Sequence, residues 1–164
     1  MSSETFSVLV ENRFGVLARV SGLFSGRGYN IDSLTVSPTM NPAYSRMTIV
    51  THGDSDILEQ IEKQLNKLVE VVKVTRLTAG GFVARELMLI KVSASEDARR
   101  ELMQIASAYD ARVVGIQPDS LIIQITDVTD KLEEFVNLMK TYGVIELART
   151  GSVALVRSSR PTAS

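Results

Sequence analysis

The fold is decided by residues 6–24, which read FSVLVENRFGVLARVSGLF. Residues 6–10 form a short apolar run that is typical of a β-strand. Residues 11–15, ENRFG, interrupt that run with turn-forming side chains. Apolar residues then recur with the spacing of one helix face, at Leu17, Val20, Leu23 and Phe24. The chain therefore begins with a strand, a turn and an amphipathic helix.

The pattern continues outward from this stretch to about residue 78. Gly26 and Gly28 stand where the first helix should stop. Strands are predicted at residues 31–37, 45–51 and 69–76, and a second helix begins after Asp54, a good N-cap. The order β-α-β-β-α-β is that of the split βαβ, or ferredoxin-like, unit.

The same order of elements repeats after a glycine-containing junction at residues 78–81. Strands are predicted at residues 85–92, 112–117 and 121–126, and helices open near Ser95 and Thr129. Two extended pieces, at 144–148 and 153–156, precede a polar tail that we expect to be mobile. We therefore predict an α+β protein of two ferredoxin-like βαββαβ domains, spanning residues 1–78 and 79–164.

Composition excludes several classes of function. The 164 residues include 18 Lys and Arg, 19 Asp and Glu, no Cys and one His, with a formal net charge of −1. This balance does not favour a nucleic-acid partner, and no apolar run approaches the roughly 20 residues that span a membrane. Without Cys the chain has no thiol chemistry, and His52 at a strand end is better explained as a polar residue than as a catalytic base. With no signal-like N-terminus, we expect a cytoplasmic protein. Because the chain has no Cys and one His, we also expect it to hold no metal.

The turn before the first helix is the candidate binding site. A glycine at the mouth of a helix, Gly15, allows a ligand to approach the backbone, and the first amides of a helix attract a small anion such as a carboxylate. Asn12 adds both a donor and an acceptor. On local chemistry alone, the favoured alternative is that Asn12 caps the helix and Gly15 eases the turn.

These residues also carry a family resemblance. Residues 7–20, SVLVENRFGVLARV, resemble the start of an ACT domain, a small amino-acid-sensing module. Residues 22–36, GLFSGRGYNIDSLTV, together with 45–49 and 60–68, resemble the regulatory (small) subunit of acetohydroxyacid synthase, also called acetolactate synthase. Residues 85–92 and 148–151 are similar to the C-terminal domain of that family.

The resemblance implies a regulatory chain without catalytic residues or cofactors of its own. A separate catalytic (large) subunit would carry thiamine diphosphate, Mg and FAD, and this chain would activate it and confer feedback inhibition by valine. Two ACT domains would pair in a homodimer. The effector would bind Asn12, Gly15, Val16 and Leu17 of one chain and Asn30 and Ile31 of the other.

In that arrangement the helix-start amides take the effector carboxylate, and the two asparagines take its polar groups, including the ammonium. Leu17 and Ile31 offer apolar surface to a branched side chain. A stand-alone amino-acid sensor acting on another enzyme, and a small enzyme with an unrecognised site, are the alternatives.

Overall fold

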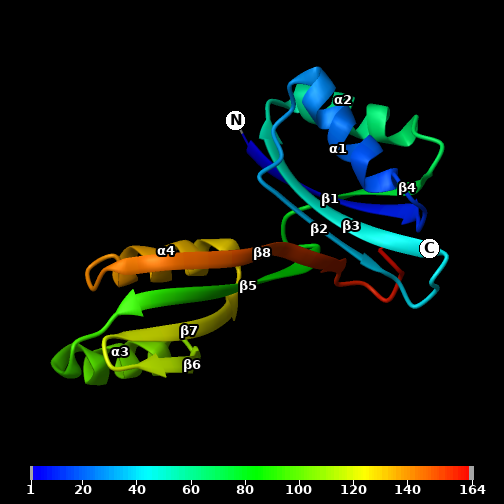
Figure 1. Ribbon diagram of the computed structural model, residues 1–164. Helices are drawn as coiled ribbons and strands as arrows, with labels where there is room; N and C mark the ends of the chain where they lie inside the picture. The colour runs from blue at the N-terminus through cyan, green and yellow to red at the C-terminus, as the bar shows by residue number, and fades with distance from the viewer. Residues whose placement is uncertain (1, 163–164) are drawn as a thin grey trace. The chain divides into compact units, whose positions relative to one another are not determined.

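The computed structural model describes residues 2–162 and contains two four-stranded antiparallel sheets, each with two helices on one face (Figure 1). The first sheet has the strand order β2-β3-β1-β4. Its elements are β1 (Ser2–Glu11), α1 (Val16–Arg27), β2 (Ser33–Pro38), β3 (Tyr44–Gly53), α2 (Ser55–Asn66) and β4 (Val71–Leu77).

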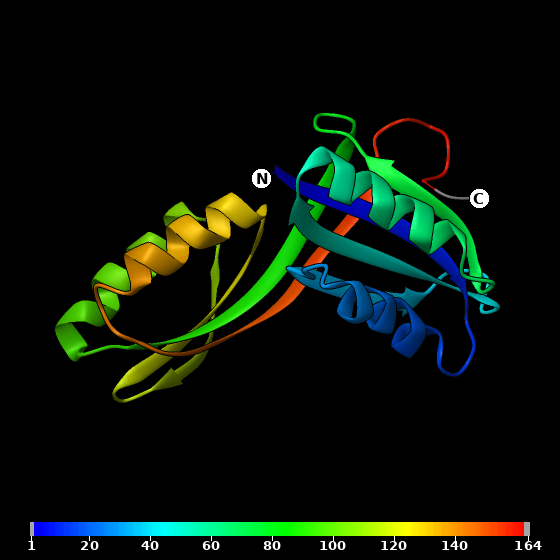
Figure 2. The ribbon, with the colours of Figure 1, turned by 90° about the horizontal axis from the view of Figure 1, so that it is seen from above.

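The second sheet repeats this order as β6-β7-β5-β8. Its elements are β5 (Phe82–Ser93), α3 (Glu96–Ala108), β6 (Arg112–Gln117), β7 (Ser120–Asp127), α4 (Thr129–Met139) and β8 (Val144–Val156). The predicted α+β fold of two βαββαβ units is therefore confirmed (Figure 2).

Contacts divide the chain into two compact units. One comprises the described residues of Met1–Ala84 and Ser152–Ser164, and the other is Arg85–Gly151. The end of β8 thus belongs to the first unit, whereas the sequence places it in the second repeat. The predicted boundary between residues 78 and 79 stays a prediction.

Alternation along β1 builds the first core. Phe6, Val8 and Val10 point to the helix-covered face and are buried, and β3 adds Met47 and Ile49 to the same cluster. β1 pairs with β3 over ten residues, from Ser2 opposite Gly53 to Glu11 opposite Tyr44. This central antiparallel pair supports both helices.

The buried face of α1 differs from the predicted one by one residue. Val16, Val20 and Phe24 are buried at intervals of four, whereas Leu17 is 45% exposed. Both Val16 and Leu17 fit a helical period, and only packing against the sheet selects between them. Leu17 therefore lies at the surface beside the predicted binding loop.

The C-terminal strands and tail differ from expectation in two places. β8 is one continuous strand through Gly151, whose φ of 84° lets the strand pass a residue that the sequence pattern treats as a break. The tail is anchored rather than mobile as far as Thr162: its hydroxyl accepts from the amide of Val156 at 2.9 Å, and its carbonyl accepts from the hydroxyl of Thr75 at 2.7 Å. The rest of the tail lies outside the described residues.

A buried ion pair ties two strands of the second unit together. Glu86 on β5 is 6% exposed and accepts from Arg149 Nε on β8 at 2.7 Å and from Nη2 at 3.2 Å. Glu133 on α4 also contacts the guanidinium. Hydrogen bonding to Glu86 raises the pKa of Arg149, so the guanidinium stays charged. The pair therefore contributes charge-assisted hydrogen bonds where water is largely excluded.

We predict that Glu86→Gln lowers the free energy of unfolding by about 1–3 kcal/mol, because the amide offers Arg149 one neutral acceptor instead of two charged oxygens and leaves the guanidinium without this buried counter-ion. Urea unfolding followed by circular dichroism measures this loss. Glu59→Gln is the matched control, since Glu59 pairs with Lys63 on the exposed face of α2 at 2.8 Å and should leave the midpoint unchanged. Equal effects of the two substitutions would contradict the prediction.

Candidate functional site

The loop between β1 and α1 presents a helix start that lacks the usual cap. Gly15 is the N-cap residue, with φ 85° and ψ −7°, and no side chain caps the helix. No acidic residue stands in the first turn of α1. The left-handed backbone of Gly15 explains why glycine is needed here.

Two amides of this helix are open to a ligand. Val16 N donates to Arg13 O over a long 3.4 Å, and Arg19 N donates to Gly15 O at 3.0 Å. The amides of Leu17 and Ala18 between them have no recorded acceptor among residues 2–162. Because they lie at the positive end of the helix dipole, they can receive a carboxylate. Ala18 was not predicted from the sequence; counting amides from the N-cap would have found it.

The starts of α2 and α3 are closed to such a ligand. The Asp54 side chain accepts from Ile57 N at the start of α2, and Ser95 accepts from Ala98 N at the start of α3. Both helices also have an acidic residue in the first turn. The start of α1 therefore differs in chemistry from these two.

Asn12 does not cap α1. Its Nδ2 donates to Pro42 O at 3.0 Å, and its backbone amide donates to Ala43 O at 2.8 Å. Both hydrogen bonds fasten the loop between β1 and α1 to the turn between β2 and β3. The alternative in which Asn12 caps the helix is thus wrong. The pairing of β1 with β3 brings the β2–β3 turn close to Asn12, and its side chain bonds to that turn instead of to the start of α1. Its Oδ1 accepts no recorded hydrogen bond within the described chain and can take an ammonium.

A buried carboxylate holds the same helix turn in place. Glu70, 8% exposed, accepts from Arg19 Nη1 at 2.9 Å, and its carbonyl accepts from Glu11 N at 2.9 Å. Arg13 pairs with Glu11 at 3.0 Å, and Phe14 is fully exposed at the tip of the loop. The end of β1, the start of β4 and the first turn of α1 are therefore fixed to one another.

Asn30 and Ile31 lie at the other end of α1, just before the edge strand β2. The buried Thr51 on β3 donates to Asn30 O, and Asp32 N donates to Val50 O at 2.8 Å. The side chain of Asn30 points its Nδ2 at Nε2 of His52, 3.1 Å away. Ile31 is half-buried against the first core. This segment is thus hydrogen-bonded to the end of β3.

The structure therefore brings the predicted site residues together in two groups. Asn12, Gly15, Val16 and Leu17 form one, and Asn30 with Ile31 forms the other. The 12 residues of α1 separate the groups by about 18 Å, while one extended residue spans about 3.5 Å. One amino acid cannot touch both groups of the same chain.

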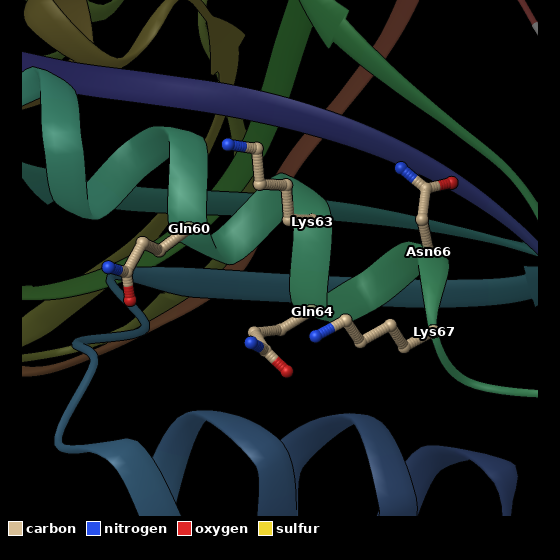
Figure 3. A pocket seen from close by; sticks show the side chains of 5 residues that line it. All are labelled: Gln60, Lys63, Gln64, Asn66 and Lys67. Atoms are coloured by element: carbon tan, nitrogen blue, oxygen red, sulfur yellow. The ribbon is translucent and has the colours of Figure 1, made fainter.

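One concave region of the surface lies away from these residues. One open groove of about 450 Å³ lies along α2 and is lined by Gln60, Lys63, Gln64, Asn66 and Lys67 (Figure 3). Gln60 accepts from the Tyr29 hydroxyl at 3.3 Å, and Lys63 is paired with Glu59. None of the predicted effector residues lines it. Within residues 2–162, no cluster of three potential metal ligands is present, and no helix is long and apolar enough to cross a membrane.

Comparison with known proteins agrees with this architecture. Residues 6–73 match the family described as AHAS small subunit-like ACT domain, and residues 85–158 match the small subunit of acetolactate synthase. The probable acetolactate synthase small subunit of Archaeoglobus fulgidus is 51% identical over 156 residues, covering 95% of this chain and 98% of that protein. The chain belongs to the acetolactate synthase small-subunit family.

Further members of the family agree over nearly the full length. The acetolactate synthase isozyme 3 small subunit of Escherichia coli is 45% identical over 94% of this chain and 95% of that protein. The crystal structure of the acetolactate synthase small subunit from Thermotoga maritima is 41% identical, with a TM-score of 0.88 over 98% of this chain and 100% of that chain. The acetolactate synthase small-subunit fold thus extends through both βαββαβ units.

We predict that Gly15→Ala lowers the free energy of unfolding by about 1 kcal/mol, because an L side chain at φ 85° is strained even in open space. Gly15→Asn should cost less, since asparagine tolerates the left-handed region. Thermal unfolding of both variants measures the difference. An alanine variant as stable as the wild type would show that the loop relaxes to another backbone conformation.

Proposed function

We propose that this chain activates the catalytic subunit of acetolactate synthase and makes it sensitive to feedback inhibition by valine or another branched-chain amino acid. The observation that carries the proposal is the start of α1, where Gly15 exposes the free amides of Leu17 and Ala18. Membership of a family whose first domain is ACT-like supports a regulatory role. The chain itself performs no chemistry in this scheme.

The effector carboxylate binds the amides of Leu17 and Ala18. Its ammonium donates hydrogen bonds to Oδ1 of Asn12 and of Asn30. Its branched side chain lies against Leu17 and Ile31. The side chain of Val16 is buried, so that residue contributes backbone only. Because one methylene in such a pocket changes binding by about 1–3 kcal/mol, discrimination among valine, leucine and isoleucine is modest.

A homodimer completes the site. The two groups of predicted residues lie at opposite ends of α1, and a single small molecule requires the second group from another chain. Asn30 and Ile31 adjoin the edge strand β2, where a second copy can approach.

Regulation then works through the partner subunit. Thiamine diphosphate, Mg and FAD reside on the catalytic subunit, which condenses two pyruvates or pyruvate with 2-ketobutyrate. The effector favours a dimer geometry that holds that subunit less active. Coupling of this kind is typically worth about 1–3 kcal/mol between the two sites.

Reconstitution tests this function. Adding the chain to purified catalytic subunit should raise the rate of acetolactate formation, and valine should reverse the increase. An unchanged rate with no valine sensitivity would refute the assignment. Valine binding by the isolated chain without any effect on the enzyme would favour a stand-alone sensor instead.

We expect Gly15→Asp to abolish valine inhibition while leaving activation of the catalytic subunit intact, because its carboxylate repels the effector carboxylate from the same amides. Isothermal titration of the isolated variant with valine, beside the activation assay, measures both effects. Gly15→Asn separates added bulk from added charge and should retain measurable binding. Unchanged valine affinity in the aspartate variant would overturn the proposed carboxylate site.

A further inference from the structure

Three polar side chains cluster where β3 ends and β2 begins. His52 Nδ1 lies 2.8 and 3.0 Å from the two carboxylate oxygens of Asp32, and His52 Nε2 lies 3.1 Å from Asn30 Nδ2. The imidazole is therefore held on both sides, with one nitrogen against an acceptor and the other against an amide group. Asn30 is the only one of the three that the proposed effector site uses.

The carboxylate fixes which nitrogen carries the proton in the neutral ring. Asp32 accepts hydrogen bonds only, so Nδ1 is the protonated nitrogen and Nε2 is left as an acceptor. Asn30 Nδ2 then donates to Nε2, which turns Asn30 Oδ1 away from the ring. That oxygen is thereby presented to a ligand as an acceptor.

Protonation of the ring reverses this arrangement. When Nε2 also carries a proton, it becomes a donor and faces the donor Nδ2 of Asn30. The amide of Asn30 must rotate, so that Oδ1 accepts from Nε2 and the NH₂ group takes the place of the oxygen. An effector ammonium would then meet a donor instead of an acceptor.

We propose that neutral His52 is a positioning residue that aims the Asn30 oxygen at the effector ammonium, and that protonation of His52 weakens effector binding. The inference deepens the proposed function and rests on it. Proton and effector compete through one side-chain amide, so effector affinity falls as the pH falls.

The surroundings of His52 contain few other groups that could produce this dependence. Its register partner on β1 is the uncharged Ser3. Asp54, next along the chain, uses its carboxylate as the cap of α2, and the Tyr29 hydroxyl donates to Gln60. Asp32 is the only ion-pair partner recorded for His52 within residues 2–162. His52 is also the only histidine of the 164 residues.

Isothermal titration of the isolated full chain with valine at about pH 7.5 and about pH 5.5 tests the proposal. We expect the wild type to bind valine at least about fivefold more weakly at the lower pH. His52→Gln places an uncharged acceptor near the position of Nε2, so it should bind valine equally well at both values. His52→Phe lacks an acceptor and should bind weakly at both.

A second measurement separates positioning from folding. The single histidine gives one set of imidazole signals in a ¹H–¹⁵N spectrum. When valine is bound, these signals should show that Nδ1 carries the proton of the neutral ring. Asp32→Asn removes the acceptor that selects this tautomer and should weaken valine binding at about pH 7.5. Asp97→Asn, an exposed carboxylate on α3, is the matched control and should change nothing.

The outcomes distinguish a failure of this inference from a failure of the proposed effector-binding function. Valine affinity in the wild type that is independent of pH or rises at low pH overturns the role of His52 alone, as does a pH dependence that survives in His52→Gln. Absence of valine binding at both pH values overturns the inference together with the proposed effector site.

Discussion

The antiparallel pairing of β1 with β3 is the constraint on which the first unit depends. The ladder runs over ten residues, or about 34 Å. At one end it brings the turn at Pro42 and Ala43 to Asn12, which fastens the loop before α1. At the other end it sets His52 and Thr51 beside Asn30. Both groups of candidate site residues are thus positioned by the same pair of strands, one at each end.

Local pattern was sufficient to predict the order of elements. Each strand is a short apolar run, each helix has an apolar repeat, and Gly15 and Gly28 bound α1 as expected. Choices that depend on three-dimensional packing were not predictable. Val16 and Leu17 fit the helical period equally well, and only the sheet beneath decides that Val16 is buried. The sequence predicts two extended pieces, at 144–148 and 153–156, where the structure has the single strand β8, because the polar residues and glycine between them interrupt the apolar pattern.

The candidate site was likewise predictable only where its residues are neighbours in the sequence. Gly15 and its neighbours are consecutive in sequence, so their shared place at a helix start follows from the local pattern. The partners of Asn12 and Asn30 are 30 and 22 residues away along the chain, and their proximity requires the register of β1, β2 and β3. For this reason the sequence alone indicates only that His52 is a polar residue at a strand end. Its contact with Asn30 is a property of the ladder and leaves no local signal.

The two βαββαβ units share a fold and differ in chemistry at equivalent positions. The first helix of each unit follows the first strand, yet α1 begins at a bare glycine and α3 begins at Ser95, whose hydroxyl accepts from Ala98 N. Glu96 and Asp97 then place negative charge where a carboxylate ligand would bind, so the start of α3 repels what the start of α1 attracts. Duplication of the fold therefore did not duplicate the chemistry of this helix start. The start of α1 is therefore the better candidate for a carboxylate site than the start of α3, which is both capped and acidic.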